Sequence, residues 1–139
     1  MATQKPLLPH SFVAASDMSA SSVQYRFVTL TAEGLARLCT ATTDIPVGVL
    51  QNSPLLGEVA EVCLIGISKL RIGAADIVSG ALVGTDALGR GITLPVGTTG
   101  TAQYVVGRVI DTALDSLAGD NDGSLVTALI NALTPNRAV

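Results

Sequence analysis

Residues 58–72 read EVAEVCLIGISKLRI and contain the longest run of β-type sequence in the chain. In an extended conformation, successive side chains point to opposite faces. One face then carries Val62, Leu64, Leu70 and Ile72, and the other carries Ile65, Ile67, Lys69 and Arg71. A glycine inside a strand marks a bulge or a bend. We therefore predict one long strand with an irregularity at Gly66.

Shorter segments of β-type sequence surround this strand, separated by Gly, Pro, Asn and Asp. Residues 23–31 (VQYRFVTLT) alternate, and residues 34–42 (GLARLCTAT) are predicted to pair with them across a turn at 31–34. Other short strands are predicted within residues 45–54, 80–84, 89–94, 102–114 and 125–133. The alanine-rich residues 73–83 and 124–133 could instead form short helices. Their β-branched residues and the closely spaced turns favour strands over most of the chain.

The first 22 residues differ from the rest because they contain Pro6 and Pro9 and show no clean period. We interpret residues 1–22 as an extended arm, 23–134 as a single β-rich domain and 135–139 as a C-terminal tail. The predicted fold class is mainly β: a small, compact barrel or sandwich with an N-terminal arm and at most one or two short helices. Apolar residues in the arm indicate a docking segment. Its candidate contact residues are Lys5, Pro6, Leu7, Leu8, His10 and Phe12.

The composition points to a protein that contacts other proteins. Of the 139 residues, 48% are hydrophobic and only 14% are charged, so much of the surface is expected to be apolar and weakly charged. The net charge of −3 and the scattered basic residues argue against nucleic-acid binding, which needs clustered Lys and Arg to neutralise phosphates.

Other features bear on the compartment. Cys39 and Cys63 lie far apart in apolar stretches, which favours two buried thiols and leaves a disulfide open. We find no pattern of a signal peptide and no apolar stretch of the ~20 residues that would span a bilayer. We therefore expect no membrane association and synthesis in the cytoplasm.

Residues 83–91 (VGTDALGRG) come close to a phosphate-binding loop. Such a loop needs Lys and then Ser or Thr after its second glycine, followed by a helix. Here Arg90 and Gly91 occupy those positions, and an extended segment follows. We interpret the stretch as a tight turn in which Asp86 accepts backbone hydrogen bonds and Gly89 has a positive φ.

Residues 119–124 (GDNDGS) invite a calcium-loop interpretation. A calcium loop of the helix–loop–helix type needs a bidentate glutamate about six residues after its glycine. No acidic residue follows Gly123 at that distance, so we predict a turn around Asn121 and Gly123.

Catalytic candidates are weak, and we expect no enzymatic activity. His10 is the single histidine and lies in the arm. An unanchored arm cannot hold this side chain, the candidate base, within ~3 Å of a nucleophile. Glu58 and Glu61 would point to opposite faces of a strand. Lys69 could be the attachment lysine of a carrier domain, but such a lysine needs an exposed hairpin tip and Lys69 falls mid-strand. No catalytic, cofactor or metal residue is therefore assigned.

The order of turns and strands in residues 46–131 resembles the head-decoration, or capsid cement, proteins of tailed double-stranded DNA phages. The similar features are an EVxVxxxGxxxLxxG strand, an IxxGxxVxxDxxGR hairpin, a YxVGxxIDxA strand and a Gly/Asp-rich loop before a last apolar strand. The hairpin rests on Gly80, Asp86, Gly89 and Arg90, and the later strand on Tyr104, Gly107 and Ala113.

This resemblance implies a compact, β-tulip-like domain that is often a homotrimer. It implies a place on the outer capsid surface at three-fold or quasi-three-fold positions, where the protein bridges major capsid protein subunits and stabilises the head. Two alternatives stay open: another virion β-protein of a tail or spike, and a small β-barrel carrier or ligand-binding module.

Overall fold

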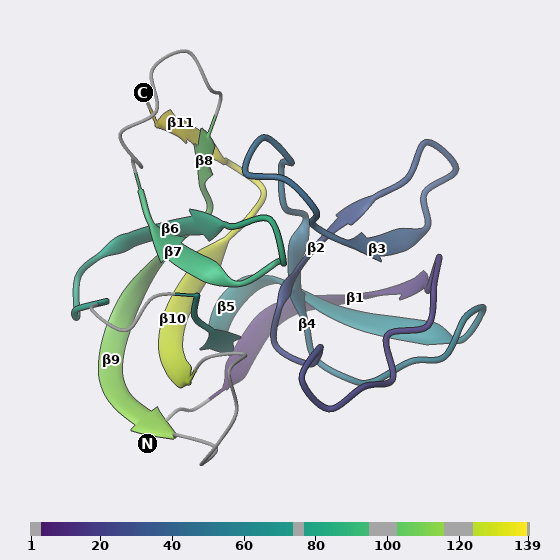
Figure 1. Cartoon of the computed structure of the whole chain (residues 1–139), viewed down its shortest axis with the longest axis horizontal. Helices are drawn as coiled ribbons and strands as arrows, with labels where there is room; N and C mark the ends of the chain where they lie inside the picture. Colours follow the sequence, from purple (N-terminus) through teal and green to yellow (C-terminus); the bar gives the residue numbers. More distant parts are fainter. Residues whose placement is uncertain (1–3, 74–76, 95–102, 116–123, 139) are drawn as a thin grey trace.

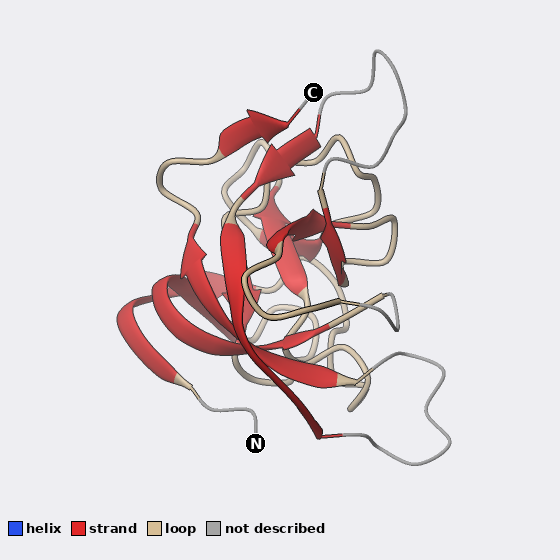
Figure 2. Ribbon diagram, turned by 90° about the vertical axis from the view of Figure 1, so that its left-hand side faces the viewer, coloured by secondary structure: helices blue, strands red, loops and turns tan. Residues whose placement is uncertain are grey.

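The computed structural model describes residues 4–73, 77–94, 103–115 and 124–138. Every regular element in these ranges is a β-strand, and none of these residues belongs to a helix, so no membrane-spanning helix is found among them (Figures 1 and 2). The predicted fold class, a small and compact β protein, is confirmed. The strands are β1 (Lys5–Val13), β2 (Phe27–Leu30), β3 (Ala36–Leu38), β4 (Gly48–Leu50), β5 (Val59–Arg71), β6 (Leu82–Thr85), β7 (Gly91–Thr93), β8 (Gln103–Val105), β9 (Gly107–Asp115), β10 (Leu125–Asn131) and β11 (Asn136–Ala138).

One antiparallel sheet contains nine of these strands, in the order β3-β2-β4-β5-β10-β9-β6-β7, with β1 also paired to β5. Two isolated bridges, Ile72 with Gly91 and Ala14 with Ala36, bring the two end strands back towards β5. The sheet is therefore curled on both sides of β5 (Figure 1). Strands β8 and β11 form a separate two-stranded sheet.

The central strand β5 is the longest, with 13 residues, as the sequence predicts. Gly66 has a φ of +134°, and the register of β1 against β5 shifts on either side of Leu8, opposite this part of β5. The irregularity predicted at Gly66 is therefore present. Its physical basis is close approach, because a Cβ on Gly66 would lie 2.5 Å from the backbone nitrogen of Leu7.

The apolar interior consists of two clusters, and both reach β5. The larger cluster contains Phe27, Cys39, Val49, Leu70, Ile72, Ile77, Val83, Val106, Val109, Val126, Ala128, Ile130 and Ala132. The smaller cluster contains Ala14, Met18, Val28, Ala36, Leu50, Ala60 and Val62. Aliphatic side chains supply nearly all of both clusters, and Phe27 is the one buried aromatic ring among the described residues. Burial of apolar surface and dispersion contacts between aliphatic groups therefore stabilise the fold.

Two local features differ from the sequence expectation, and one open alternative is decided in favour of the predicted strand. Residues 23–26 do not extend β2, because Tyr25 has a φ of +68° and the strand begins at Phe27. Asn136–Ala138, expected to be a tail, pair with β8 as β11. The strand predicted within residues 125–133 is present as β10, rather than the alternative short helix, because β5 and β9 each offer it a hydrogen-bonding partner.

Candidate interaction surface

The arm residues lie against the sheet of their own chain. Strand β1 runs antiparallel to residues 59–67 of β5, from Lys5 opposite Ile67 to Val13 opposite Val59. At its start, the Gln4 side chain accepts a hydrogen bond from the Tyr25 hydroxyl at 3.2 Å. Beyond its end, the Ala14 N–H donates to the Glu58 carbonyl at 2.8 Å. The strand is thus held at both ends.

The six candidate contact residues all lie in β1, but their side chains differ in environment. Leu7 and Leu8 are exposed apolar residues, with 79% and 43% of their surface accessible, and Lys5 and Pro6 are exposed beside them. Phe12 instead packs against the smaller core cluster. The His10 ring meets the Phe12 ring edge-on, with 4.8 Å between centroids. Among these six candidate residues, the exposed large apolar side chains are therefore those of Leu7 and Leu8.

The outer edge of β1 is poorly suited to receive another strand. Ala14 donates its N–H towards Glu58, next to β5, whereas Ala15 donates its N–H to the Ala36 carbonyl on the opposite side. Backbone groups of successive residues alternate between the two edges of a strand. Because the register from Pro9 to Val13 is regular, Pro9 faces away from β5. Proline lacks an N–H, so it blocks pairing at this edge.

The stretch at residues 83–91 forms the β6–β7 hairpin. Asp86 Oδ1 accepts the backbone N–H groups of Leu88 and Arg90, each at 2.8 Å, and Gly89 has a φ of +77°. These are the interactions that the turn interpretation requires, and strand β7 stands where a phosphate loop needs a helix. Gly80 has a φ of +88°, and its N–H donates to the Val109 carbonyl. Asn121 and Gly123 lie outside the described residues.

The described residues include no group of three or more His, Cys, Asp or Glu side chains that could hold a metal ion. Cys39 and Cys63 are free thiols, and burial raises their pKa to about 12 and about 11. A thiol that stays protonated at neutral pH is a poor nucleophile. Lys69 lies mid-strand in β5, with its Nζ 5.5 Å from the centroid of the Tyr25 ring. That is not the hairpin tip which a carrier lysine needs.

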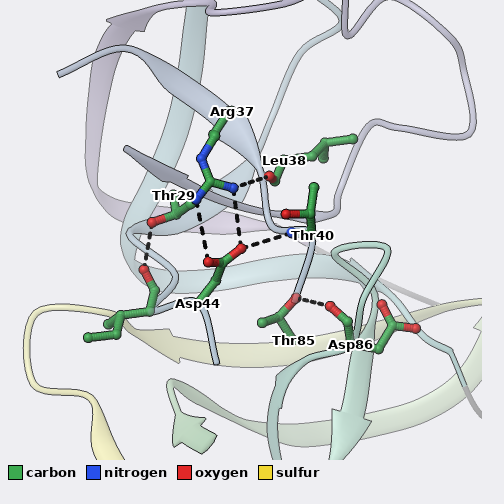
Figure 3. Close-up of polar contacts among 8 residues, drawn as sticks. Thr29, Arg37, Leu38, Thr40, Asp44, Thr85 and Asp86 are labelled. Carbon is green, nitrogen blue, oxygen red and sulfur yellow. Dashed lines mark hydrogen bonds and ion pairs between the residues drawn. The ribbon is translucent and has the colours of Figure 1, made fainter. Parts of the chain in front are cut away.

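Polar contacts between β3 and the loop after it were not evident from sequence (Figure 3). Arg37 and Asp44 form an ion pair at 3.3 Å, and the Thr40 N–H donates to the same carboxylate at 2.9 Å. Burial would by itself raise the pKa of Asp44, but the hydrogen bonds from Thr40 and Arg37 hold that pKa below its ordinary value. This pair fixes the loop that leads into β4.

Two buried arginines tie residues 21–26 to the body of the protein. The Arg71 side chain donates to the Gln24 and Ser21 carbonyls, and the Arg26 side chain donates to the Ser22 and Leu88 carbonyls. These bonds hold the segment around Tyr25, whose positive φ is rare for a residue that carries a Cβ. The sequence showed only isolated basic residues, which are normally exposed.

No protein-family model and no curated protein sequence matches the chain. Among solved structures, the chain is similar to the N base of the head fiber protein gp8.5 of bacteriophage phi29. The TM-score is 0.57, the sequences are 18% identical, and the match covers 90% of this chain and 94% of that one. The two proteins share a fold over nearly their whole lengths.

Proposed function

We propose that this protein is a non-enzymatic structural component of a phage virion that decorates and stabilises the head. The observation that carries the proposal is the fold shared with the base of a phage head fiber over 90% of the chain. The resemblance of residues 46–131 to capsid cement proteins supports it independently, because that resemblance rests on the order of turns and strands in the sequence.

The proposed site of action is the outer capsid surface. There the protein bridges neighbouring major capsid protein subunits at three-fold or quasi-three-fold positions, and it acts as a homotrimer. The weakly charged, aliphatic composition supports a role built on protein contacts rather than on charged ligands. Several weak contacts acting together can raise avidity by ~10²–10⁴ over a single one.

The proposed capsid contact is the exposed side of β1, through the side chains of Leu7 and Leu8. Full burial of one leucine contributes roughly 1.5–3 kcal/mol. Strand β1 is already paired with β5, so binding does not have to order nine flexible residues, which would cost roughly 1 kcal/mol or more for each. This preorganisation favours a side-chain contact over the addition of β1 to a neighbour's sheet.

Co-sedimentation with expanded phage heads that lack this protein tests the proposal. We expect the wild-type chain to pellet with heads and the double variant Leu7→Ser/Leu8→Ser to pellet much less, with an unchanged melting temperature. Leu88→Ser is the matched control, since Leu88 is also exposed but lies in the β6–β7 turn. A wild-type chain that ignores heads would overturn the proposed function. Equal binding by wild type and double variant would exclude β1 as the capsid contact and leave the rest of the proposed function unaffected.

A further inference from the structure

Exposed apolar side chains gather at the start of β5. Val13 and Val59 are directly opposite each other on β1 and β5, and Leu55 and Leu56 lie in the loop just before β5. All four are exposed, Leu56 most of all at 67%. The Gly57 N–H donates to the Ala14 carbonyl at 3.0 Å and so ties this loop to the end of β1.

Three carboxylates accompany these residues. Glu58 Oε2 accepts the Leu55 N–H at 3.0 Å, and Glu61 accepts the Ser11 hydroxyl at 2.6 Å. The Met18 N–H donates to the Pro54 carbonyl, which places the preceding residue, Asp17, beside the loop. Hydrogen bonds from Ser19 lower the pKa of Asp17. We call Val13, Leu55, Leu56, Val59 and these three carboxylates the acidic end.

The opposite side of the molecule carries a second exposed surface. Successive strand pairings place five residues in one row across β1, β5, β10, β9 and β6: Lys5, Ile67, Leu129, Arg108 and Leu82. Directly opposite residues in a sheet share a face. Lys5, Arg108, Leu129 and Leu82 are exposed, and Ile67 is half-buried. We call this row the basic end. In Figure 1, β6, β9 and β10 lie on the far side of the molecule from the start of β5.

The basic end contains a shallow hollow of about 180 Å³, lined by residues that include Leu82, Val105, Arg108, Leu129, Asn131 and Thr134. A cavity of about 150 Å³ accommodates a benzene molecule, so the hollow has room for a leucine side chain. The Arg108 side chain donates to the Gly80 carbonyl at 3.2 Å. A carbonyl carries no net charge, and the guanidinium therefore keeps its positive charge at the rim.

We propose that the acidic end of one molecule docks on the basic end of a second copy of this chain. The projecting Leu56 fills the hollow beside Leu129, and the carboxylates of the acidic end face Arg108 and Lys5. Complementary charge favours this pairing, whereas contact between two acidic ends would bring like charges together. Contacts between two different surfaces of identical chains generate rings or open chains.

This contact rests on the self-association included in the proposed function and specifies which surfaces of the two copies meet. It does not depend on capsid binding. Its test therefore uses the isolated chain: analytical ultracentrifugation over a range of concentrations, with folding checked by circular dichroism. Two variants disable one end each, Leu56→Asp for the acidic end and Arg108→Glu for the basic end. Leu88→Asp changes an exposed leucine outside both ends and is the control.

We expect the wild type and Leu88→Asp to associate with rising concentration, and each disabling variant to sediment as a monomer. An equimolar mixture of the two disabling variants should form a 1:1 dimer and grow no further. The Arg108→Glu molecule keeps its acidic end, the Leu56→Asp molecule keeps its basic end, and the remaining two ends are both disabled. If Arg108→Glu does not fold, Leu82→Glu replaces it, because it puts a negative charge at the rim of the same hollow.

A wild-type chain that stays monomeric up to millimolar concentration would overturn this contact, as would disabling variants that associate like wild type or a mixture that remains monomeric. None of these results bears on head binding, which is measured separately by co-sedimentation. Failure of the contact between copies is thus distinguishable from failure of the proposed function.

Discussion

The backbone nitrogen of Leu7 lies 2.5 Å from the position that a Cβ on Gly66 would occupy. The Lys5 carbonyl and the Pro6 Cα are each 2.8 Å from the same position. Gly66 thus lets β1 cross close to the middle of β5, and its φ of +134° is one that residues with a side chain rarely adopt. Gly66 therefore permits both the irregular backbone of β5 at this point and the close packing of β1 against it.

Replacing Gly66 by alanine is therefore expected to destabilise the protein. Backbone strain costs of order 1–3 kcal/mol, and overpacking against the backbone of β1 adds a penalty of similar size. Urea denaturation of Gly66→Ala should show this loss. The matched control is Gly57→Ala: Gly57 has a φ of +82°, but a Cβ on it would meet nothing within 4 Å, so only about 1–2 kcal/mol should be lost. Equal losses would show that contact with β1 is unimportant.

The carboxylate of Asp86 organises the β6–β7 turn. It accepts two backbone N–H groups and also the Arg90 Nε at 2.9 Å. A hydrogen bond to a charged group contributes about 1.5–3 kcal/mol, so the loss of both backbone bonds in Asp86→Ala should lower the free energy of unfolding by about 3–6 kcal/mol. Arg90→Met removes the ion pair but leaves both backbone bonds to Asp86, so it should cost less than Asp86→Ala. If Arg90→Met were the more harmful change, the ion pair rather than the backbone bonds would hold the turn.

The ion pair of Arg37 and Asp44 predicts a dependence of stability on pH. The pKa of Asp44 is lower in the folded protein than its ordinary value of 3.8. Its contribution is therefore complete above pH ~4 and is lost as the pH falls through the folded pKa. Asp44→Asn should lower the free energy of unfolding at pH 7 by about 1 kcal/mol or less. The difference between variant and wild type should shrink at acidic pH; a constant difference would contradict this assignment.

The two buried thiols should be inert while the protein is folded. Burial raises the pKa of Cys39 to about 12 and that of Cys63 to about 11, from ordinary values of 9.0. Ellman's reagent at pH 8 should label neither thiol in buffer and both in denaturant. Because unfolded thiols ionise first, stability should decline as the pH rises above about 9. Rapid labelling of the folded protein would show that one site opens readily.

Local sequence patterns determined most of the strands of this protein. Alternation in residues 58–72 and the glycine within them predicted β5 and its irregularity, because side-chain periodicity and glycine's conformational freedom are local properties. The hairpins at 31–34 and 86–89 followed from turn-forming residues in the same way. Leu7 and Leu8 could be named from sequence as candidate contacts, because their apolar side chains indicate a docking segment; their exposure in the folded chain is a finding of the structure.

Only the tertiary structure decided where the arm lies and which residues share a surface. Pairing of β1 with β5 joins residues more than 45 positions apart, and no short-range pattern encodes such a choice. The row from Lys5 to Leu82 likewise depends on the registers of four strand pairs, in which a slip of one residue would turn a whole strand over. Composition and periodicity determined that the chain forms β-strands and that some of its apolar side chains stay exposed. Long-range register determined where on the molecule those side chains lie.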